Sequence, residues 1–195
     1  MIRDVDGFER SGEVAAERLK GAGSALIIGH IDADGITASS IASVSLHRAG
    51  IENSVHFVKK LDEAAIKKVH AHPADTLWFV DLGSAMLSKL DGDRCIITDH
   101  HRPEPLNEEV LYREGHVNPH LFHIDGSTEV SASGVTYMVA KRMDPQNQDL
   151  SAMAVVGAVG DFQESAEGRL VGYNRSILDD AVSWGLIRAE KDVRL

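Results

Sequence analysis

The sequence predicts an α/β fold, with a parallel β-sheet that carries helices on both faces. Two observations favour this class. Short apolar runs of strand type alternate along the chain with segments of helical length and periodicity. Several of these runs also end directly in aspartate or histidine, and ligands of an open α/β sheet bind beyond the carboxyl ends of its strands. A length of 195 residues is typical of one domain.

The individual elements follow from these patterns and from their end signals. Gly21 ends a first amphipathic helix, and Gly50 ends the helix after the first strand. Ser131 and Ser133 cap a later helix that begins near Gly134; as an alternative, the N-terminus of that helix faces the cleft and receives a phosphate. The predicted elements are helix 8–19, strand 25–29, helix 37–48, strand 54–58, helix 62–69, strand 77–80, strand 94–98, and helices 133–142, 150–159 and 173–184.

Composition excludes several classes of protein. Cys95 is the only cysteine, so no intramolecular disulfide can form, and its place in a predicted core strand indicates an inert buried thiol. The N-terminus has no apolar signal region, and the longest weakly polar stretch, 152–160, is far shorter than the about 20 residues of a membrane helix. We therefore expect a cytoplasmic protein with no membrane contact. The net charge of -10 argues against a protein that holds nucleic acid by general electrostatics, so phosphate contacts must be local.

A histidine and two aspartates directly follow the first predicted strand. If His30, Asp32 and Asp34 continue that strand, the side-chain period of two places all three on one face. Carboxylates so close together repel one another unless protons or cations neutralise them. Near neutral pH, divalent cations are the better explanation, and the segment is interpreted as part of a metal site.

Further acids and histidines end the other apolar runs. Asp81 follows the run 76–80, and Asp161 follows the apolar stretch 153–160. A single aspartate in such a place is usually a turn former or a helix cap. The run 95–97 leads into the triplet Asp99-His100-His101. Because the carboxyl ends of parallel strands share one edge of the sheet, we expect these groups to meet in one cleft, and in this company Asp81 and Asp161 are predicted metal ligands.

Four ordered motifs resemble those of the DHH phosphoesterase superfamily, and its RecJ-like nucleases most closely, over about residues 20–188. The motifs are His30-Ile31-Asp32-Ala33-Asp34-Gly35, the lone Asp81, the triplet Asp99-His100-His101, and Gly160-Asp161. The resemblance implies a single DHH-type catalytic domain over 1–195, with an N-terminal helix in 1–22 and a catalytic core in 23–188. The family usually carries a second, DHHA1-like substrate-binding domain with a G-G-G-H segment, which is expected to be absent because this sequence has no such segment.

The resemblance also implies the roles of the site residues. Carboxylate and imidazole ligands suit Mn²⁺, with Mg²⁺ as a plausible alternative and Zn²⁺ a further one, and two ions are expected. One ion would be held by His30, Asp32 and Asp81, and the other by Asp34, Asp81, His100 and Asp161. The expected catalytic residues are Asp99, which fixes the ring orientation of its histidine neighbours, His101, which faces the scissile phosphate, and Arg102, which contacts the substrate.

The function that follows is metal-dependent hydrolysis of phosphodiester bonds in single-stranded DNA or RNA by an exonuclease of RecJ-like type. Two alternatives stay open: a phosphodiesterase or phosphatase that acts on short oligonucleotides or dinucleotides, and a non-catalytic scaffold associated with replication. The resemblance to archaeal RecJ-like proteins also implies a protein partner from the replication complex.

Overall fold

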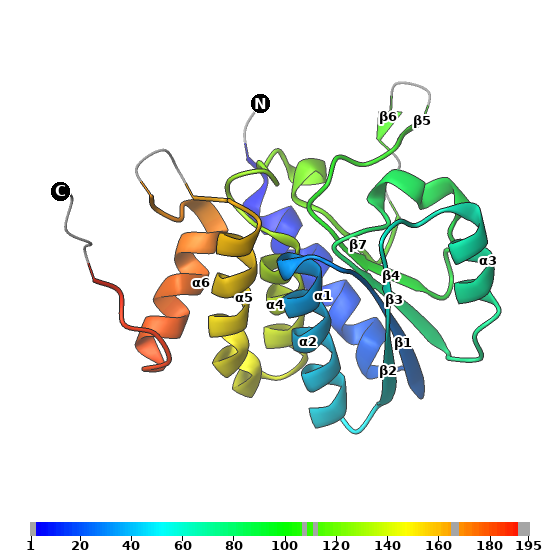
Figure 1. Cartoon of the computed structure of the whole chain (residues 1–195), viewed down its shortest axis with the longest axis horizontal. Coiled ribbons are helices and arrows are strands. Elements are labelled where there is room, and N and C mark those ends of the chain that lie inside the picture. Colours follow the sequence, from blue (N-terminus) through cyan, green and yellow to red (C-terminus); the bar gives the residue numbers. More distant parts are fainter. Residues whose placement is uncertain (1–2, 107–108, 111–112, 165–167, 191–195) are drawn as a thin grey trace.

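A five-stranded parallel sheet lies at the centre of the computed structural model, which describes residues 3–106, 109–110, 113–164 and 168–190 (Figure 1). The strand order is β2-β1-β3-β4-β7, and every neighbouring pair is parallel. The strands are β1 (Ser24–His30), β2 (Glu52–Val58), β3 (Thr76–Val80), β4 (Cys95–Thr98) and β7 (His116–Val117), and a separate antiparallel pair is formed by β5 (Pro105–Leu106) and β6 (Glu109–Val110).

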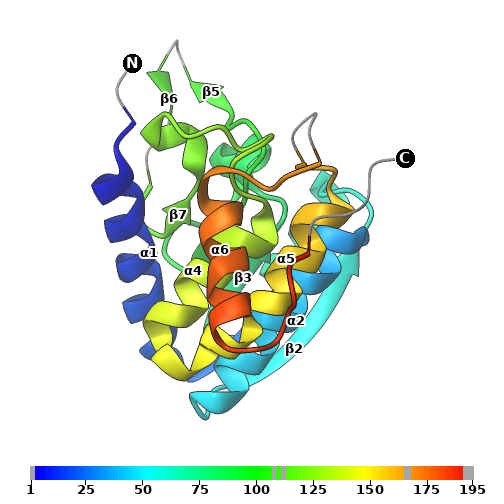
Figure 2. The same ribbon diagram turned by 90° about the vertical axis from the view of Figure 1, so that its left-hand side faces the viewer.

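Helices cover both faces of the sheet, as the sequence predicts. The α-helices are α1 (Val5–Lys20), α2 (Ala33–Arg48), α3 (Glu63–His70), α4 (Ala132–Met143), α5 (Ser151–Gly160) and α6 (Gly172–Ser183), and the 3₁₀ helices are η1 (Ser84–Lys89), η2 (Pro119–Phe122) and η3 (Pro145–Leu150). Helices α1, α2 and α4 pack on one face, whereas α3 and η1 pack on the other. Helices α5 and α6 form an outer layer against α2 and α4 (Figure 2).

The alternation of side chains along the strands explains this layering. Ile27 and Trp78 face the core with α1, α2 and α4, while the next residues along each strand, Ile28 and Phe79, face the core with α3. All four side chains are fully buried. Because both faces are covered, the inner strands consist of continuous apolar runs rather than alternating ones. Those runs were the signal that predicted β1, β3 and β4.

The order of the strands places a crevice at the carboxyl ends of β1 and β3. From β1 the chain runs outward to β2 and then returns to the other side of β1 to form β3, so the direction of winding changes between these two strands. At such a switch point the loops leave to opposite faces, and ligands of open α/β sheets bind there. His30 and Asp81 lie at these two strand ends.

Two glycines bring α5 against the start of α2. A Cβ atom added at Gly157 would clash with the Thr37 hydroxyl and lie 2.6 Å from Asp34 Oδ1, and one added at Gly160 would lie 2.5 Å from the Cβ of Ala33. Real Cβ atoms do not approach other atoms so closely. The two helices therefore lie in backbone contact at the end that carries Asp34 and Asp161.

The sequence prediction differs from the structure at several elements: α1 begins at Val5 and not at residue 8, β2 begins at Glu52 and not at residue 54, and strands β5 and β6 and helices η1, η2 and η3 were not predicted. Helix α2 begins at Ala33, not at residue 37, and the short strand β7 was not predicted. Within the residues that the structure describes, no helix has the length and apolar character needed to cross a membrane.

Candidate metal centre

The segment after β1 does not continue as a strand. The prediction that a strand period of two brings His30, Asp32 and Asp34 together on one face is therefore wrong. Asp32 is instead the N-cap of α2, and its Oδ1 accepts a hydrogen bond of 2.9 Å from the Gly35 N–H. Its Oδ2 lies 2.7 Å from His30 Nδ1. The capping bond is the physical reason for the early helix start, because aspartate satisfies an N–H that the helix leaves free. His30 and Asp32 still converge, through this cap and not through a strand period.

Asp34 points away from this pair, toward the N-terminus of α4. Its two oxygens accept hydrogen bonds from the backbone N–H groups of Ala132 (2.7 Å) and Ser133 (2.9 Å), and it is 1% exposed. Ser131 is the N-cap of α4, as predicted. The positive end of the helix stabilises the carboxylate. Asp34 thus occupies the N-terminus that the alternative prediction gave to a substrate phosphate.

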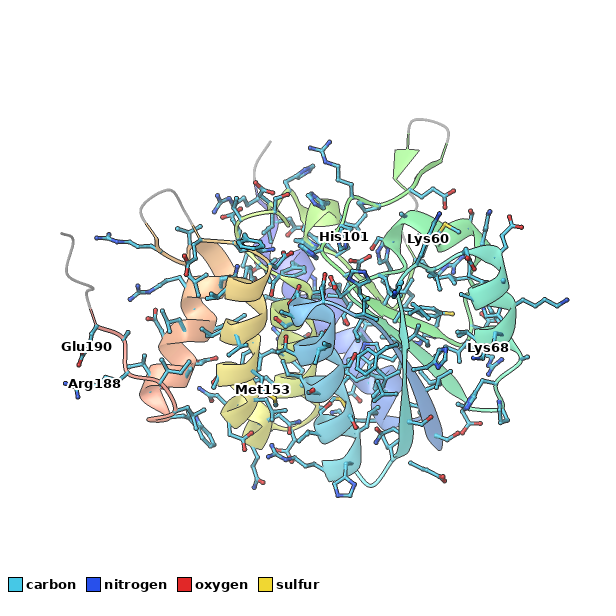
Figure 3. All side chains as sticks on the ribbon, viewed as in Figure 1. Lys60, Lys68, His101, Met153, Arg188 and Glu190 are labelled. Atoms are coloured by element: carbon cyan, nitrogen blue, oxygen red, sulfur yellow. The ribbon has the colours of Figure 1, made fainter. Side chains whose placement is uncertain are left out.

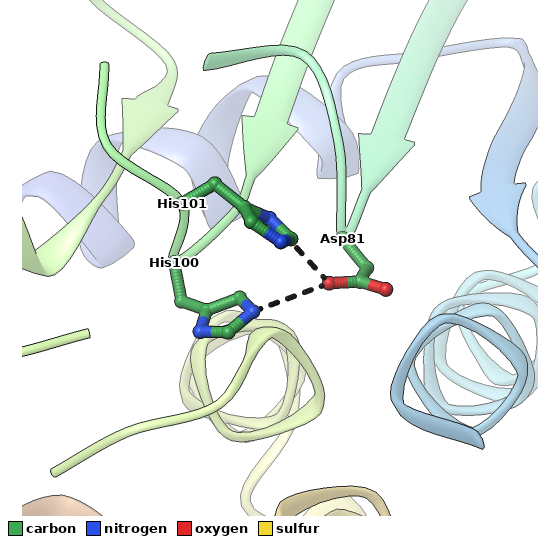
Figure 4. Close-up of side chains that lie close together, drawn as sticks. All are labelled: Asp81, His100 and His101. Carbon is green, nitrogen blue, oxygen red and sulfur yellow. Dashed lines mark ion pairs between the residues drawn. The ribbon is translucent and has the colours of Figure 1, made fainter. Parts of the chain in front are cut away.

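Asp81 directs its two carboxylate oxygens toward different neighbours. Oδ2 lies 3.5 Å from His30 Nδ1. Oδ1 lies 3.4 Å from His100 Nε2 and 3.8 Å from His101 Nδ1 (Figure 4). The residue is 3% exposed and has a φ of 62°, in the left-handed region that aspartate and asparagine tolerate better than most side chains. Such a conformation costs about 1–3 kcal/mol and is found most often at functional sites.

Asp99 supports the two histidines from behind. Its Oδ1 accepts hydrogen bonds from the backbone N–H groups of His100 (2.8 Å) and His101 (3.2 Å) and from His101 Nδ1 (2.8 Å), and its Oδ2 accepts one from the Ser84 N–H. Desolvation is outweighed by these bonds and by the two imidazoles, so the pKa of Asp99 lies far below its usual range. A carboxylate with so many donors is committed to holding the loop and the His101 ring.

The ring of His100 is oriented by a different group. Its Nδ1 lies 2.6 Å from the Gly126 carbonyl oxygen, so Nδ1 carries a hydrogen and Nε2 is the nitrogen directed at the carboxylates. Nε2 lies 3.4 Å from Asp81, 3.6 Å from Asp161 Oδ2 and 3.9 Å from Asp34 Oδ2. A backbone or carboxylate acceptor behind the ring is the usual arrangement of a histidine that binds a metal ion.

The described residues contain three groups whose ligand atoms lie within 4.8 Å of one another. They are His30 with Asp32 and Asp81, Asp34 with His100 and Asp161, and Asp81 with His100 and His101. Two buried atoms at the centre, Asp81 Oδ2 and His100 Nε2, have no hydrogen-bond partner. Buried polar atoms are rarely left unpaired. Because one of these atoms is a carboxylate oxygen and the other an imidazole nitrogen, and both bind metal ions, the residues fit a divalent cation.

The electrostatics of the cluster also favour a cation. Burial raises the pKa of Asp81 to about 7, opposed by the nearby His100 imidazole and reinforced by the charges of Asp34, Asp99 and Asp32. Burial lowers the pKa of His100, but Asp81, Asp34 and Asp99 outweigh it and raise that pKa to about 10. The field at the centre therefore favours positive charge, which a proton or a metal ion supplies.

Arg102 stands apart from the other predicted site residues. Its side chain is exposed beside His101, and it forms no hydrogen bond or ion pair with the part of the chain that the structure describes. Its predicted contact with the substrate remains a prediction.

Two supporting residues were missed at this site. Gln163 is fully buried and donates hydrogen bonds of 2.9 Å to Asp161 Oδ2 and 2.8 Å to the Gly126 carbonyl, and it accepts one of 2.7 Å from Asn174. His116 is buried, and its Nε2 lies 2.8 Å from the hydroxyl of Ser84, whose N–H donates to Asp99. Only proximity to Asp161 in the sequence could have indicated Gln163, because a lone glutamine carries no motif.

A parallel sheet with carboxylates and imidazoles gathered at its switch point is typical of α/β domains that bind a ligand or a metal ion at the carboxyl ends of their strands. Residues 24–160 match the model of the DHH family, N-terminal domain. The chain belongs to this family, and the resemblance noted in its sequence is confirmed at that level.

Individual relatives agree with the family. An uncharacterized protein of Methanocaldococcus jannaschii is 31% identical over 176 residues, which cover 86% of this chain and 39% of that protein. The solved structure of exonuclease RecJ bound to manganese superimposes with a TM-score of 0.68 at 20% identity and covers 94% of this chain and 48% of that one. RecJ from Thermus thermophilus in complex with Mn²⁺ gives a TM-score of 0.66 at 21% identity and covers 91% and 26%.

At identities of 20–21%, the superposition on these solved structures shows a shared fold and no more. The chain spans less than half the length of these relatives.

Proposed function

We propose that this domain is a metal-dependent exonuclease that hydrolyses the phosphodiester bonds of single-stranded nucleic acid with two divalent ions, Mn²⁺ or Mg²⁺. The observation that carries the proposal is Asp81, whose two oxygens face two separate groups of candidate ligands. A carboxylate in that position suits a bridge between two ions. The manganese bound in the RecJ structures supports the choice of metal.

The residues divide into two ligand sets around this bridge. His30 and Asp32 would hold one ion together with Asp81, and the second would be held on the other side of Asp81 by Asp34, His100 and Asp161. When bound, two such ions orient a water molecule for attack on phosphorus, lower its pKa, and stabilise the leaving oxygen. The hydrogen bonds of Asp34 to α4 and of His100 to Gly126 fix both ligands before any ion arrives.

His101 is the residue we propose for direct contact with the phosphate. Its Nδ1 is held by Asp99, which raises the pKa of His101, and the ring is 57% exposed. Its other nitrogen is therefore free to donate a hydrogen bond to a phosphate oxygen. A positioned donor of this kind stabilises the charge that develops in the transition state.

A second candidate function is hydrolysis of short oligonucleotides or dinucleotides, and the surface charges favour it. Several basic side chains that could follow a phosphate backbone are already paired with acids, among them Lys141 with Asp180 at 2.7 Å and Arg175 with Asp179 at 3.1 Å. A small substrate needs few phosphate contacts besides those of the metal centre. The two functions share one site and differ in substrate length.

The proposal is tested with chelator-treated protein supplied with Mn²⁺ or Mg²⁺. Single-stranded DNA, single-stranded RNA and a dinucleotide, each labelled at one end or the other, are compared by product length. Asp81→Asn should abolish hydrolysis, whereas Asp75→Asn, at the opposite end of the same strand, should not. Absence of metal-dependent hydrolysis of all three substrates by the wild-type protein would refute the proposed function.

A further inference from the structure

Phe162 is an aromatic residue held almost completely in solvent beside the candidate metal centre. It is 90% exposed, although it directly follows Asp161, whose Oδ2 lies 3.6 Å from His100 Nε2. The Cα atoms of consecutive residues are about 3.8 Å apart. Figure 3 labels His101 and also Met153, which lies in the first part of α5. In this view α5 runs from the side of Met153 toward the edge of the molecule that carries His101. Phe162 therefore lies at the edge of the molecule where substrate would bind.

The backbone at Phe162 is fixed in a conformation that normally selects glycine. Its N–H donates to the Val159 carbonyl at 3.1 Å and that of Gln163 donates to the Ala158 carbonyl at 3.1 Å, which together form a Schellman motif at the end of α5. The residue at this position adopts the left-handed conformation, and φ of Phe162 is 55°. An aromatic side chain there is strained relative to glycine.

The neighbours on both sides prevent the loop from turning Phe162 inward. Asp161 faces His100, and Gln163 is fully buried in hydrogen bonds to Asp161, Gly126 and Asn174. Phe162 is thus the residue of this tripeptide that points to solvent, and its backbone is held in place by the hydrogen bonds at the end of α5. Exposure of a large aromatic group, strain, and a position next to a metal ligand together indicate a role in function and not in packing.

We infer that Phe162 stacks on a nucleobase of the substrate, next to the phosphate that is cleaved. This inference rests on the proposed function and specifies its substrate class as a phosphodiester with an unpaired base. Aromatic side chains bind single strands by stacking, which tolerates every base because each has a π face. In a duplex that face is covered by the neighbouring base pairs. The same residue therefore discriminates single-stranded from double-stranded nucleic acid without any basic groove.

The test compares hydrolysis of an oligothymidylate with that of an oligomer of the same length whose sugar–phosphate backbone carries no bases. Phe162→Ala should lower kcat/KM for the oligothymidylate by about 10- to 100-fold, which corresponds to about 1.4–2.8 kcal/mol, and leave the abasic substrate unaffected. Phe162→Trp should retain the preference for bases. Val156→Ala is the matched control, because Val156 is an exposed apolar residue of α5 (58%), one turn further from the site than Val159.

A glycine variant separates the role in function from stability. Phe162→Gly removes the strain, so its Tm should rise while its activity on the oligothymidylate falls as in Phe162→Ala. A purely structural role would lower both. Equal losses of kcat/KM on the two substrates, or no loss on either, would overturn the stacking role. No loss on either would point instead to contact of Phe162 with a protein partner.

The outcome also distinguishes this inference from the proposed function. If the wild-type protein hydrolyses neither oligomer, nor single-stranded RNA nor the dinucleotide, the proposed function fails. Fluorescence anisotropy of the same labelled oligomers then decides the stacking role: it requires wild-type protein to bind the oligothymidylate more tightly than the abasic strand, and Phe162→Ala to lose that difference. Equal binding of both strands by the wild-type protein would reject it.

Discussion

Replacement of Asp81 by asparagine tests whether two ions share one carboxylate. Asparagine keeps the shape of the side chain and tolerates the left-handed backbone at φ 62°, so the fold should survive. Each bound ion stabilises the folded state by RT ln(1 + [L]/Kd), which is about 2.7 kcal/mol at a hundredfold excess over Kd. For a chain of this size that corresponds to a rise in Tm of about 5–11 °C per site.

The expected loss follows from the geometry. Changes behind a ligand already weaken metal binding by about 10- to 100-fold, and loss of a direct ligand weakens it more. At the same Mn²⁺ concentration, [L]/Kd in Asp81→Asn therefore falls to about 1 or less at both sites, and the stabilisation falls to about 0.4 kcal/mol per site. Asp32→Asn should keep the stabilisation from one ion, because Asp32 belongs to a single group and asparagine also caps helices well.

Differential scanning fluorimetry with a Mn²⁺ titration and calorimetric determination of stoichiometry would measure these effects, with Asp75→Asn as the control. Hydrolysis of a single-stranded oligonucleotide is followed in the same variants. Two equivalents of Mn²⁺ bound by Asp81→Asn, with a wild-type rise in Tm or near wild-type turnover, would remove Asp81 as a bridge.

Three further predictions concern the other groups of the molecule. His100→Ala should lower metal occupancy, whereas His101→Ala should bind both ions and lose about 10²-fold or more in turnover; equal metal loss in both, measured by elemental analysis, would show that this division is mistaken. Burial raises the pKa of the Cys95 thiol to about 12, so at pH 8 the native protein should resist Ellman's reagent and react only when unfolded, and rapid reaction of the native protein would contradict its place in the core. Because the net charge is -10 and few phosphates are contacted, the logarithmic salt slope of single-strand binding should be only about -1.4 to -2.1, and a much steeper slope in anisotropy titrations would reveal a basic groove.

Apolar runs were sufficient to predict the inner strands of the sheet. Strands β1, β3 and β4 are buried on both sides, so their sequences are continuously apolar and end sharply at polar residues. Strand β7 has two residues, His116 and Val117, and no such run. Its strand character comes from pairing with β4, which is a tertiary contact that no local pattern records.

The candidate site was predicted as a set of residues more successfully than as a geometry. His30, Asp32 and Asp81 do converge, but the strand period invoked for the first loop is wrong, because Asp32 could either extend the strand or cap a helix and the cap prevailed. That Asp34 would lie against the N-terminus of α4 could not be predicted, since the two segments are about a hundred residues apart. The roles of the individual ligands remain predictions.

The contact between α2 and α5 through Gly157 and Gly160 gives these glycines a second significance. Asp34 and Asp161 belong to the same candidate group, yet one is carried by α2 and the other by the end of α5. The distance between the two carboxylates therefore depends on how closely the two helices approach. Gly157 and Gly160 permit this close approach because they have no Cβ atom. Because Mg²⁺ requires ligands near 2.0–2.1 Å and other ions accept longer bonds, the fit of each ion to this candidate group would depend on the helix packing that the two glycines allow.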